Sequence, residues 1–180
     1  MTPVDLVGVH VEAVSGTRVV VLRERDEPHR VLAIAIGEPE AVAIALGMSG
    51  KSPPRPLSHD LLAALVDTLH AEVEHVEVTG VEHGTYLASL AVRAPSGRIA
   101  LDSRPSDAIA LALRVDAPLY ASETVLDEAG AYMTVEVVDD RDRVEDVEED
   151  VDEFRAFLDE VDPSEFEAPP DPDAPDDPAG

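Results

Sequence analysis

Three runs rich in β-branched residues stand close together at the start of the chain, and they constrain its fold more than any other feature. The runs are "VDLVGVHVEAV" (4–14), "RVVVLRE" (18–24) and "RVLAIAIG" (30–37). The segments between them, "SGT" and "RDEPH", are rich in turn-forming residues. The sequence therefore predicts three strands joined by hairpins.

A helix follows this group of strands, and the same order then returns. Glutamates in the first turn and Gly47 near the end predict a short helix over residues 38–47. Three more strands are predicted at "HVEVTGVE" (75–82), "TYLASLAVRA" (85–94) and "RIALDS" (98–103). Pro105 suits the first turn of the helix that comes next.

The two helices that close these groups are similar in sequence. With an offset of 67 residues, "EAVAIAL" (40–46) matches "DAIALAL" (107–113), and an acidic residue leads each segment. The repeat indicates two similar β-β-β-α halves, in which Glu40 and Asp107 hold related places.

The remaining segments complete an α+β fold. Five apolar residues recur at helical spacing after Ser58, which is the predicted N-cap: Leu61, Leu62, Leu65, Val66 and Leu69. Residues 118–121 predict a short strand, 122–130 a short helix and 131–138 a last strand. We expect a largely antiparallel or mixed sheet covered by helices.

The charge of the chain is concentrated at its end. Residues 1–138 hold 20 acidic and 10 basic side chains, whereas residues 139–180 hold 19 acidic and 3 basic ones. We expect a domain over 1–138, an acidic linker with an amphipathic helix over 139–166, and a disordered Pro/Asp-rich tail over 167–180. The net charge of −26 opposes nucleic acid at long range, so phosphate binding would need a local cluster of arginines.

The composition also bears on the compartment. The chain has no cysteine, which fits a reducing compartment and excludes thiolate chemistry. No basic region followed by an apolar stretch opens the chain, and no run approaches the roughly 20 apolar residues of a membrane span. We therefore expect a cytoplasmic protein without a membrane partner.

The segment "SRPSDAIALALR" (103–114) places polar residues in front of an apolar helix. One interpretation is structural: Ser106 and Asp107 cap the helix, Pro105 starts it, and Arg104 pairs with a carboxylate such as Asp102. "RPLSHD" (55–60) shares its Arg-Pro pair and its Ser and Asp.

The other interpretation is catalytic. Arg55 and Arg104 would hold a phosphodiester, while Glu40, Asp60 or Asp107 would bind a divalent metal or act as a base. His59 is the best candidate for proton transfer because an unperturbed histidine titrates close to neutral pH. This interpretation requires the two arginine-led helix starts to open onto one polar hollow.

Three segments carry a resemblance to a known family. "IGEPEAVAIAL" (36–46), "RPLSHDLL" (55–62) and "LDSRPSDAIALALR" (101–114), in this order, resemble signature segments of the bifunctional nuclease domain family. Plant members of that family are described as degrading both RNA and DNA. The likeness covers about residues 4–138, and "VDEFRAFLDEVDPSEF" (151–166) is similar to the closing helix of many bacterial members.

The resemblance implies a nuclease that hydrolyses RNA and DNA with little sequence preference. We also expect a homo-oligomer. The matched motif positions are Glu40, Arg55, His59, Asp60, Asp102, Arg104, Ser106, Asp107 and Arg114. Arg55, Arg104, Ser106 and Arg114 would bind phosphate, and His59, Asp60, Asp107 and Glu40 would be catalytic. Glu40, Asp60, Asp102 and Asp107 would hold Mg²⁺ or Mn²⁺. The alternative is a non-enzymatic module that binds a protein or an anion and uses these residues as a capping and salt-bridge network.

Overall fold

A computed structural model describes residues 1–12, 15–50 and 54–132 of the chain. The strands are β1 (Thr2–Val11), β2 (Arg18–Glu24), β3 (Val31–Ile36), β4 (Glu72–Glu82), β5 (Thr85–Ala94), β6 (Gly97–Ser103) and β7 (Leu119–Ala121). The helices are α1 (Glu38–Ser49), α2 (Ser58–Thr68), α3 (Pro105–Val115) and α4 (Glu123–Ala129). The predicted acidic linker and helix over 139–166, and the tail over 167–180, lie outside the described residues.

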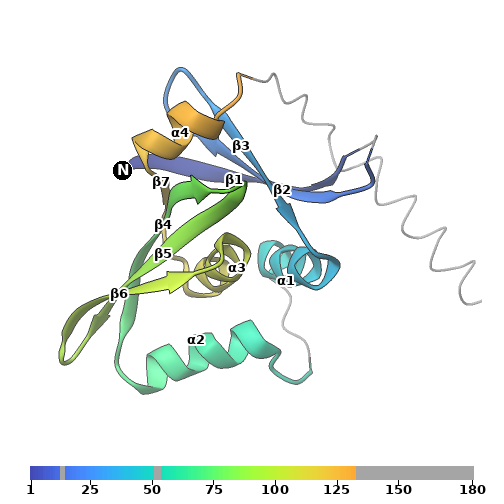
Figure 1. Ribbon diagram of the computed structural model, residues 1–180. Coiled ribbons are helices and arrows are strands. Elements are labelled where there is room, and N and C mark those ends of the chain that lie inside the picture. Colours follow the sequence, from blue (N-terminus) through green and yellow to red (C-terminus); the bar gives the residue numbers. More distant parts are fainter. Residues whose placement is uncertain (13–14, 51–53, 133–180) are drawn as a thin grey trace, which may run out of the picture. The chain divides into compact units, whose positions relative to one another are not determined.

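The seven strands form one mixed sheet in the order β3-β2-β1-β7-β4-β5-β6 (Figure 1). Each group of three strands is an antiparallel meander that ends in a helix, α1 after β3 and α3 after β6. The short strand β7 lies between the groups, antiparallel to β1 and parallel to β4. The α+β class, the mixed sheet and the double β-β-β-α order are therefore confirmed.

Two apolar clusters lie between the sheet and its helices. One joins the first meander to α1, α3 and α4, with Ile44, Ile109 and Leu126 fully buried. The other joins β4 and β5 to α3 and α2, and it includes Leu90 and Leu111. Such aliphatic side chains suit the pleated surface of a sheet covered by helices.

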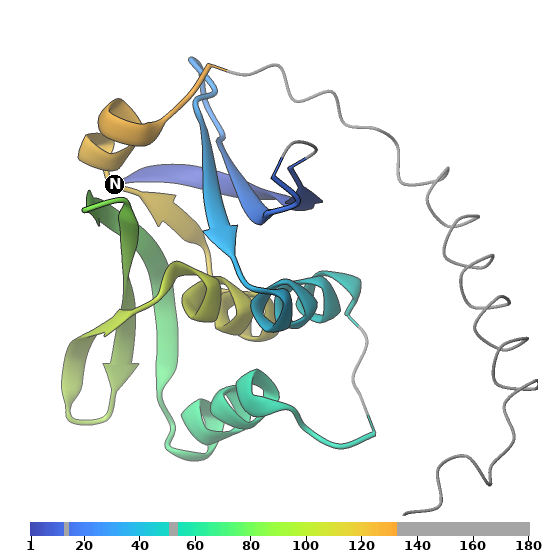
Figure 2. The same cartoon turned by 45° about the vertical axis from the view of Figure 1, so that its right-hand side comes forward.

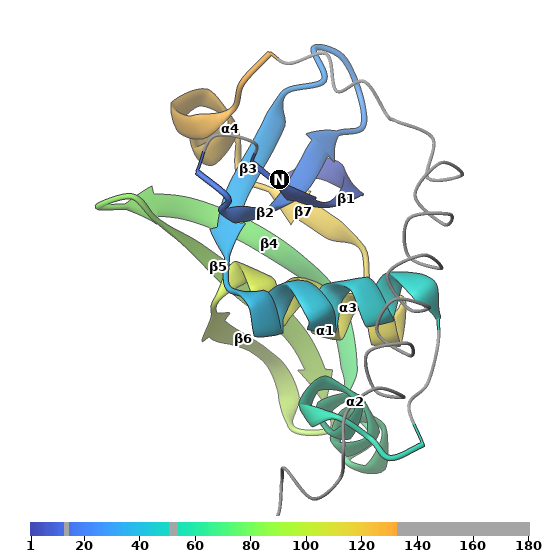
Figure 3. The same ribbon diagram turned by 90° about the vertical axis from the view of Figure 1, so that its right-hand side faces the viewer.

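Helices α1 and α3 lie side by side against the curled sheet (Figures 2 and 3). Their contact is close at Gly47, where a Cβ atom would stand 2.9 Å from Cβ of Leu113 and 3.2 Å from Nη1 of Arg114. Gly47, which marked a helix end in the sequence, therefore serves to let the two helices approach. The helix itself continues to Ser49.

Helix α2 packs on α3 through its smaller apolar residues. Ala63 and Val66 join the second cluster, whereas Leu61, Leu65 and Leu69 are largely exposed. The predicted Ser58 cap is wrong by one residue, because Leu57 is the N-cap and Ser58 is the first helical residue. Leucine has no side-chain oxygen to cap a helix. The carboxylate of Asp60 instead satisfies a backbone donor at this end, because its Oδ2 accepts a hydrogen bond from the N–H of Leu57 at 2.8 Å.

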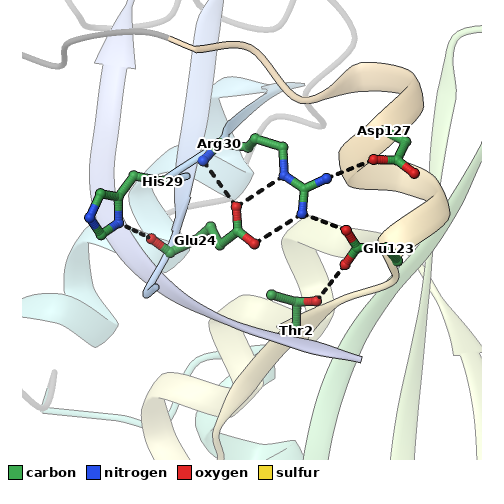
Figure 4. A network of polar contacts seen from close by, with 6 residues as sticks. All are labelled: Thr2, Glu24, His29, Arg30, Glu123 and Asp127. Carbon is green, nitrogen blue, oxygen red and sulfur yellow. Dashed lines mark hydrogen bonds and ion pairs between the residues drawn. The ribbon is translucent and has the colours of Figure 1, made fainter. Parts of the chain in front are cut away.

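A buried ion network attaches α4 to the β2–β3 hairpin (Figure 4). The Arg30 side chain is 8% exposed and donates to Oε1 and Oε2 of Glu24 at 3.0 Å each. It also donates to Glu123 and to Asp127 at 2.7 Å each. Arg30 thus fixes the end of the domain to its first meander.

The predicted last strand is described only at its start. Ala131 forms an isolated antiparallel bridge with Val31, and residues 133–138 lie outside the described residues. Among the described helices, none has the length and apolar character that crossing a membrane requires.

Candidate functional site

The first turns of α1, α2 and α3 meet at a chain of polar contacts that centres on Arg104. Nη1 of Arg104 lies 3.0 Å from Oε1 of Glu40, and its Nε donates to Oδ2 of Asp107 at 2.7 Å. The other oxygen of Asp107 lies 3.2 Å from Nε2 of His59. Four residues from three segments of the chain, Glu40, His59, Arg104 and Asp107, therefore form one polar cluster.

The cluster brings together two segments that the sequence singled out. The helix starts at "RPLSHD" and "SRPSD" meet, since His59 contacts Asp107, but Arg55 stays outside the cluster, so a hollow shared by the two arginines remains a prediction. Glu40 and Asp107, the leading acids of the repeat, both contact Arg104.

The side chains of the polar cluster differ in their access to solvent. The His59 side chain is only 14% exposed, whereas that of Arg104 is 67% exposed. Burial acts to raise the pKa of Asp107, but hydrogen bonds from Arg104 and His59 outweigh it and hold the pKa below its ordinary value. Asp107 is therefore a fixed anion at neutral pH, and it orients the imidazole and the guanidinium.

Asp60 and Arg114 form a second, structural pair beside the polar cluster. Nε of Arg114 donates to Oδ1 of Asp60, and Nη1 donates to the carbonyl oxygens of Ala43 at 3.1 Å and Ala110 at 2.7 Å. The hydrogen bond from Arg114, and then the N–H of Leu57, lower the pKa of Asp60 against the opposing effect of burial. The pair ties α2 to α1 and α3, so Arg114 has little freedom to bind phosphate.

Three other predicted site residues take no part in these contacts. Ser106 is buried in the first turn of α3. Arg55 and Asp102 are exposed, and neither has a hydrogen bond or an ion pair with another residue that the structure describes.

The capping interpretation of the α3 start is not borne out. Arg104 is itself the N-cap of α3, and no side chain caps that end. Arg104 does pair with carboxylates, as that interpretation expects, but they are Glu40 and Asp107 and not Asp102. Pro105 does begin the helix, as predicted.

The described residues do not fit a divalent metal as they are arranged. They contain no group of three or more His, Asp or Glu side chains placed to hold an ion. The three candidate carboxylates at the helix starts are each paired with an arginine: Glu40 and Asp107 with Arg104, and Asp60 with Arg114. A cation would have to compete with those guanidinium groups.

Gly37 is a positioning residue that the sequence analysis missed. A Cβ atom at Gly37 would collide with the carboxylate of Glu40, which folds back over the start of α1. The signal in the sequence was a glycine directly before "EPE" at a helix start.

An open hollow of about 530 Å³ lies away from the polar cluster, on the face of β4, β5 and β6 that turns away from α3. It is lined by Glu74, His75, Ala91, Arg98, Ile99 and Ala100. None of the predicted site residues is among them, so the hollow gives no support to the site.

The sequence profile of the family described as "Bifunctional nuclease domain" matches residues 20–134, which include every residue of the polar cluster. The chain belongs to the bifunctional nuclease domain family. An uncharacterized protein of Mycobacterium tuberculosis is 40% identical over 169 residues, which cover 93% of this chain and 99% of that protein. Two Arabidopsis thaliana proteins are more distant family relatives of this chain.

The Arabidopsis proteins carry the names of nucleases. Bifunctional nuclease 1 is 29% identical over 119 residues, which cover 64% of this chain and 37% of that protein. Bifunctional nuclease 2 is 31% identical over 107 residues, which cover 58% of this chain and 32% of that protein. This chain therefore matches only about a third of each plant protein. A nuclease activity of this chain is accordingly a proposal.

Proposed function

We propose that this protein hydrolyses phosphodiester bonds in RNA and DNA at the polar cluster formed by Glu40, His59, Arg104 and Asp107. The observation that carries the proposal is the contact of His59 and Arg104 with the same carboxylate, Asp107. A proton-transfer group and a phosphate-binding cation are thereby held next to each other, as phosphodiester hydrolysis requires.

Arg104 binds the phosphate in this proposal. Its side chain is largely exposed, and Nε and Nη1 are occupied by Asp107 and Glu40, so Nη2 is left to donate to a phosphate oxygen. The start of α3, where backbone N–H groups lack helical partners, adds a favourable potential for an anion.

His59 moves the proton. Asp107 binds Nε2, and no described residue binds Nδ1, so Nδ1 can accept a proton from the attacking water. The water oxygen then bonds to phosphorus, the bond from phosphorus to the leaving oxygen breaks, and the imidazolium returns its proton to that oxygen. Asp107 stabilises the imidazolium while it exists.

The competing function is a non-enzymatic module that binds a protein or an anion. It is favoured by the pairing of Arg104 with two carboxylates and by the net charge of −26, which both disfavour a polyanion. In that case the cluster fixes three helices and has no reaction to perform.

Nuclease assays on His59→Ala and Asp107→Asn decide between these functions. We expect each variant to lose activity on RNA and DNA by a factor of roughly 10² to 10⁴, which is the usual contribution of a positioned acid–base group. The Tm should stay within a few degrees of the native value. Asp67→Asn, an exposed position on the same helix, is the matched control and should keep full activity.

Two outcomes would contradict the proposed nuclease activity. Equal activity in native protein and both variants would mean that another nuclease contaminates the preparation. An inactive native protein, with a Tm that falls by many degrees in both variants, would establish the structural role. The same assay with EDTA, and after addition of Mg²⁺ or Mn²⁺, tests the predicted divalent metal.

A further inference from the structure

Strand β6 is an edge of the sheet, and its outer side has no partner among the described residues. All of Gly97–Asp102 is exposed. An edge strand of this length offers a row of unpaired backbone groups to another strand.

The hairpin that joins β5 to β6 determines which backbone groups face that open side. Ala94 pairs with Gly97 across a two-residue turn, so this pair is joined by hydrogen bonds. Bonded and non-bonded pairs alternate along an antiparallel ladder, and the register from β5 to β6 has no irregularity. The N–H and C=O groups of Arg98, Ala100 and Asp102 therefore point to the open side.

The side chains of β6 form a pattern that is symmetric about Ala100. Ile99 and Leu101 pair with Val92 and Leu90, so they lie on the face that the helices cover, yet they are 44% and 47% exposed. On the other face, a cation at Arg98 and an anion at Asp102 lie two residues either side of Ala100.

We propose that a second copy of this chain pairs antiparallel with β6, with the twofold axis at Ala100. In this register Arg98 of each copy lies opposite Asp102 of the other, and Ile99 lies opposite Leu101. The backbone groups that pair across the axis are those that point to the open side. Two ion pairs and four covered aliphatic side chains result, and the two sheets become continuous.

The neighbouring registers lack this match. A shift by two residues places Arg98 opposite Ala100 or opposite Arg104, and it leaves Asp102 without a cation. A shift by one residue turns the apolar face of one copy to the polar face of the other. A twofold interface needs a self-complementary surface, and the centred register supplies one.

The charged groups are available for this contact. Asp102 has no ion pair with any other residue that the structure describes. Arg98 uses Nε and Nη2 for Glu74, and Glu74 also has Arg93 at 3.3 Å, so Glu74 keeps a cation when Arg98 turns to a partner copy.

Charge reversal on the full chain tests the register. We expect the native protein to sediment as a dimer, and Arg98→Asp and Asp102→Arg to weaken the dimer at least tenfold, because each places like charges together twice. The double variant, with both reversals, should regain the dimer. Arg23→Asp, an exposed position on β2 at the opposite side of the sheet, makes the same charge change away from this edge and should leave the dimer intact.

A cysteine at the proposed axis gives an independent test, because the chain has no cysteine of its own. Paired residues of a bonded antiparallel pair have Cα atoms about 5.5 Å apart, which suits a disulfide. Oxidised Ala100→Cys should therefore run as a covalent dimer on a non-reducing gel, whereas Ala91→Cys, its neighbour on β5, should not.

Three results would overturn the proposal. The first is a native protein that stays monomeric at a few hundred micromolar. The second is a dimer that neither single reversal weakens, and the third is a folded double variant that stays monomeric. Folding of each variant is checked by its circular dichroism and Tm. None of these measurements depends on nuclease activity.

Discussion

At the scale of single residues, the strongest electrostatic constraint in the described domain lies at Arg30, away from the polar cluster. Its guanidinium holds Glu24, whose side chain is almost completely buried, and so keeps a carboxylate charged inside the protein. Hydrogen bonds from Arg30 hold the pKa of Glu24 below its ordinary value, against the opposing effect of burial. The stability that this carboxylate contributes therefore depends on pH.

The direction of that dependence follows from the lowered pKa. The contribution of Glu24 is fully present above its ordinary pKa of 4.5 and is lost as the pH falls through the lower value of the folded protein. We expect the Tm of native protein to exceed that of Glu24→Gln at pH 7, and the gap to narrow between about pH 4.5 and pH 3.

Thermal melts over this pH range check the prediction. Glu128→Gln, an exposed position on α4, is the control and should follow the native curve throughout. A gap between native protein and Glu24→Gln that stays constant down to pH 3 would contradict the assignment of the ion pair.

The residues of the site were partly predictable from the sequence. Glu40, His59, Arg104 and Asp107 were found because each stands at a predicted helix start. Their pairing was not, since it depends on how segments up to 64 residues apart pack. The shared Arg-Pro pair predicts equivalent places for Arg55 and Arg104, but Arg104 is the N-cap itself, whereas Arg55 precedes the cap at Leu57 by two residues.

At the scale of elements, the contact of α1 with α3 carries much of the geometry of the site. Arg114 of α3 reaches Asp60 and the carbonyl oxygen of Ala43 only because Gly47 allows the helices to lie close. A side chain at Gly47 would meet Cβ of Leu113, which cannot move without its backbone.

We therefore expect Gly47→Ala to destabilise the protein. Overpacking costs about 1 to 3 kcal/mol. The better helix propensity of alanine recovers up to about 1 kcal/mol. The difference, a net loss of up to about 2 kcal/mol, is measurable by denaturant unfolding. Gly80→Ala is the control, because a Cβ there meets nothing within 4 Å; equal stability of the two variants would show that the helices adapt freely.

Most elements were predictable from their patterns, and the exceptions have physical reasons. Runs such as 18–24 are rich in β-branched residues and bounded by turns, so the pattern predicts β2 with its observed bounds. The start of α2 was missed because Asp60, and not Ser58, satisfies the backbone there. The place of β7 beside β1 and β4 could not be read from a segment of three residues, because tertiary packing alone determines it.

At the scale of the whole molecule, charge opposes the proposed substrate. Residues 139–180 contribute 19 of the 39 acidic side chains and only 3 of the 13 basic ones. We propose that their negative charge competes with nucleic acid for the exposed arginines and raises the repulsion of any polyanion.

Deletion of residues 139–180 should therefore increase nuclease activity at low ionic strength. We expect kcat/KM on single-stranded RNA to rise several-fold near 20 mM salt, where screening is weak, and the difference to vanish near 0.5 M. Activities measured across a salt series check this. Equal activities of both forms at low salt would show that the acidic segment does not act on the site.

The strand β7 makes the two meanders depend on a late part of the chain. Residues 119–121 fill the place between β1 and β4, and among the described residues they are the last strand of the sheet along the chain. During synthesis, β1 and β4 would each expose unpaired backbone N–H and C=O groups along one edge until β7 leaves the ribosome. The seven-stranded sheet can then form only after almost the whole domain has been synthesised. A nascent chain that stalls before residue 119 should therefore expose two separate sheets and be bound by chaperones.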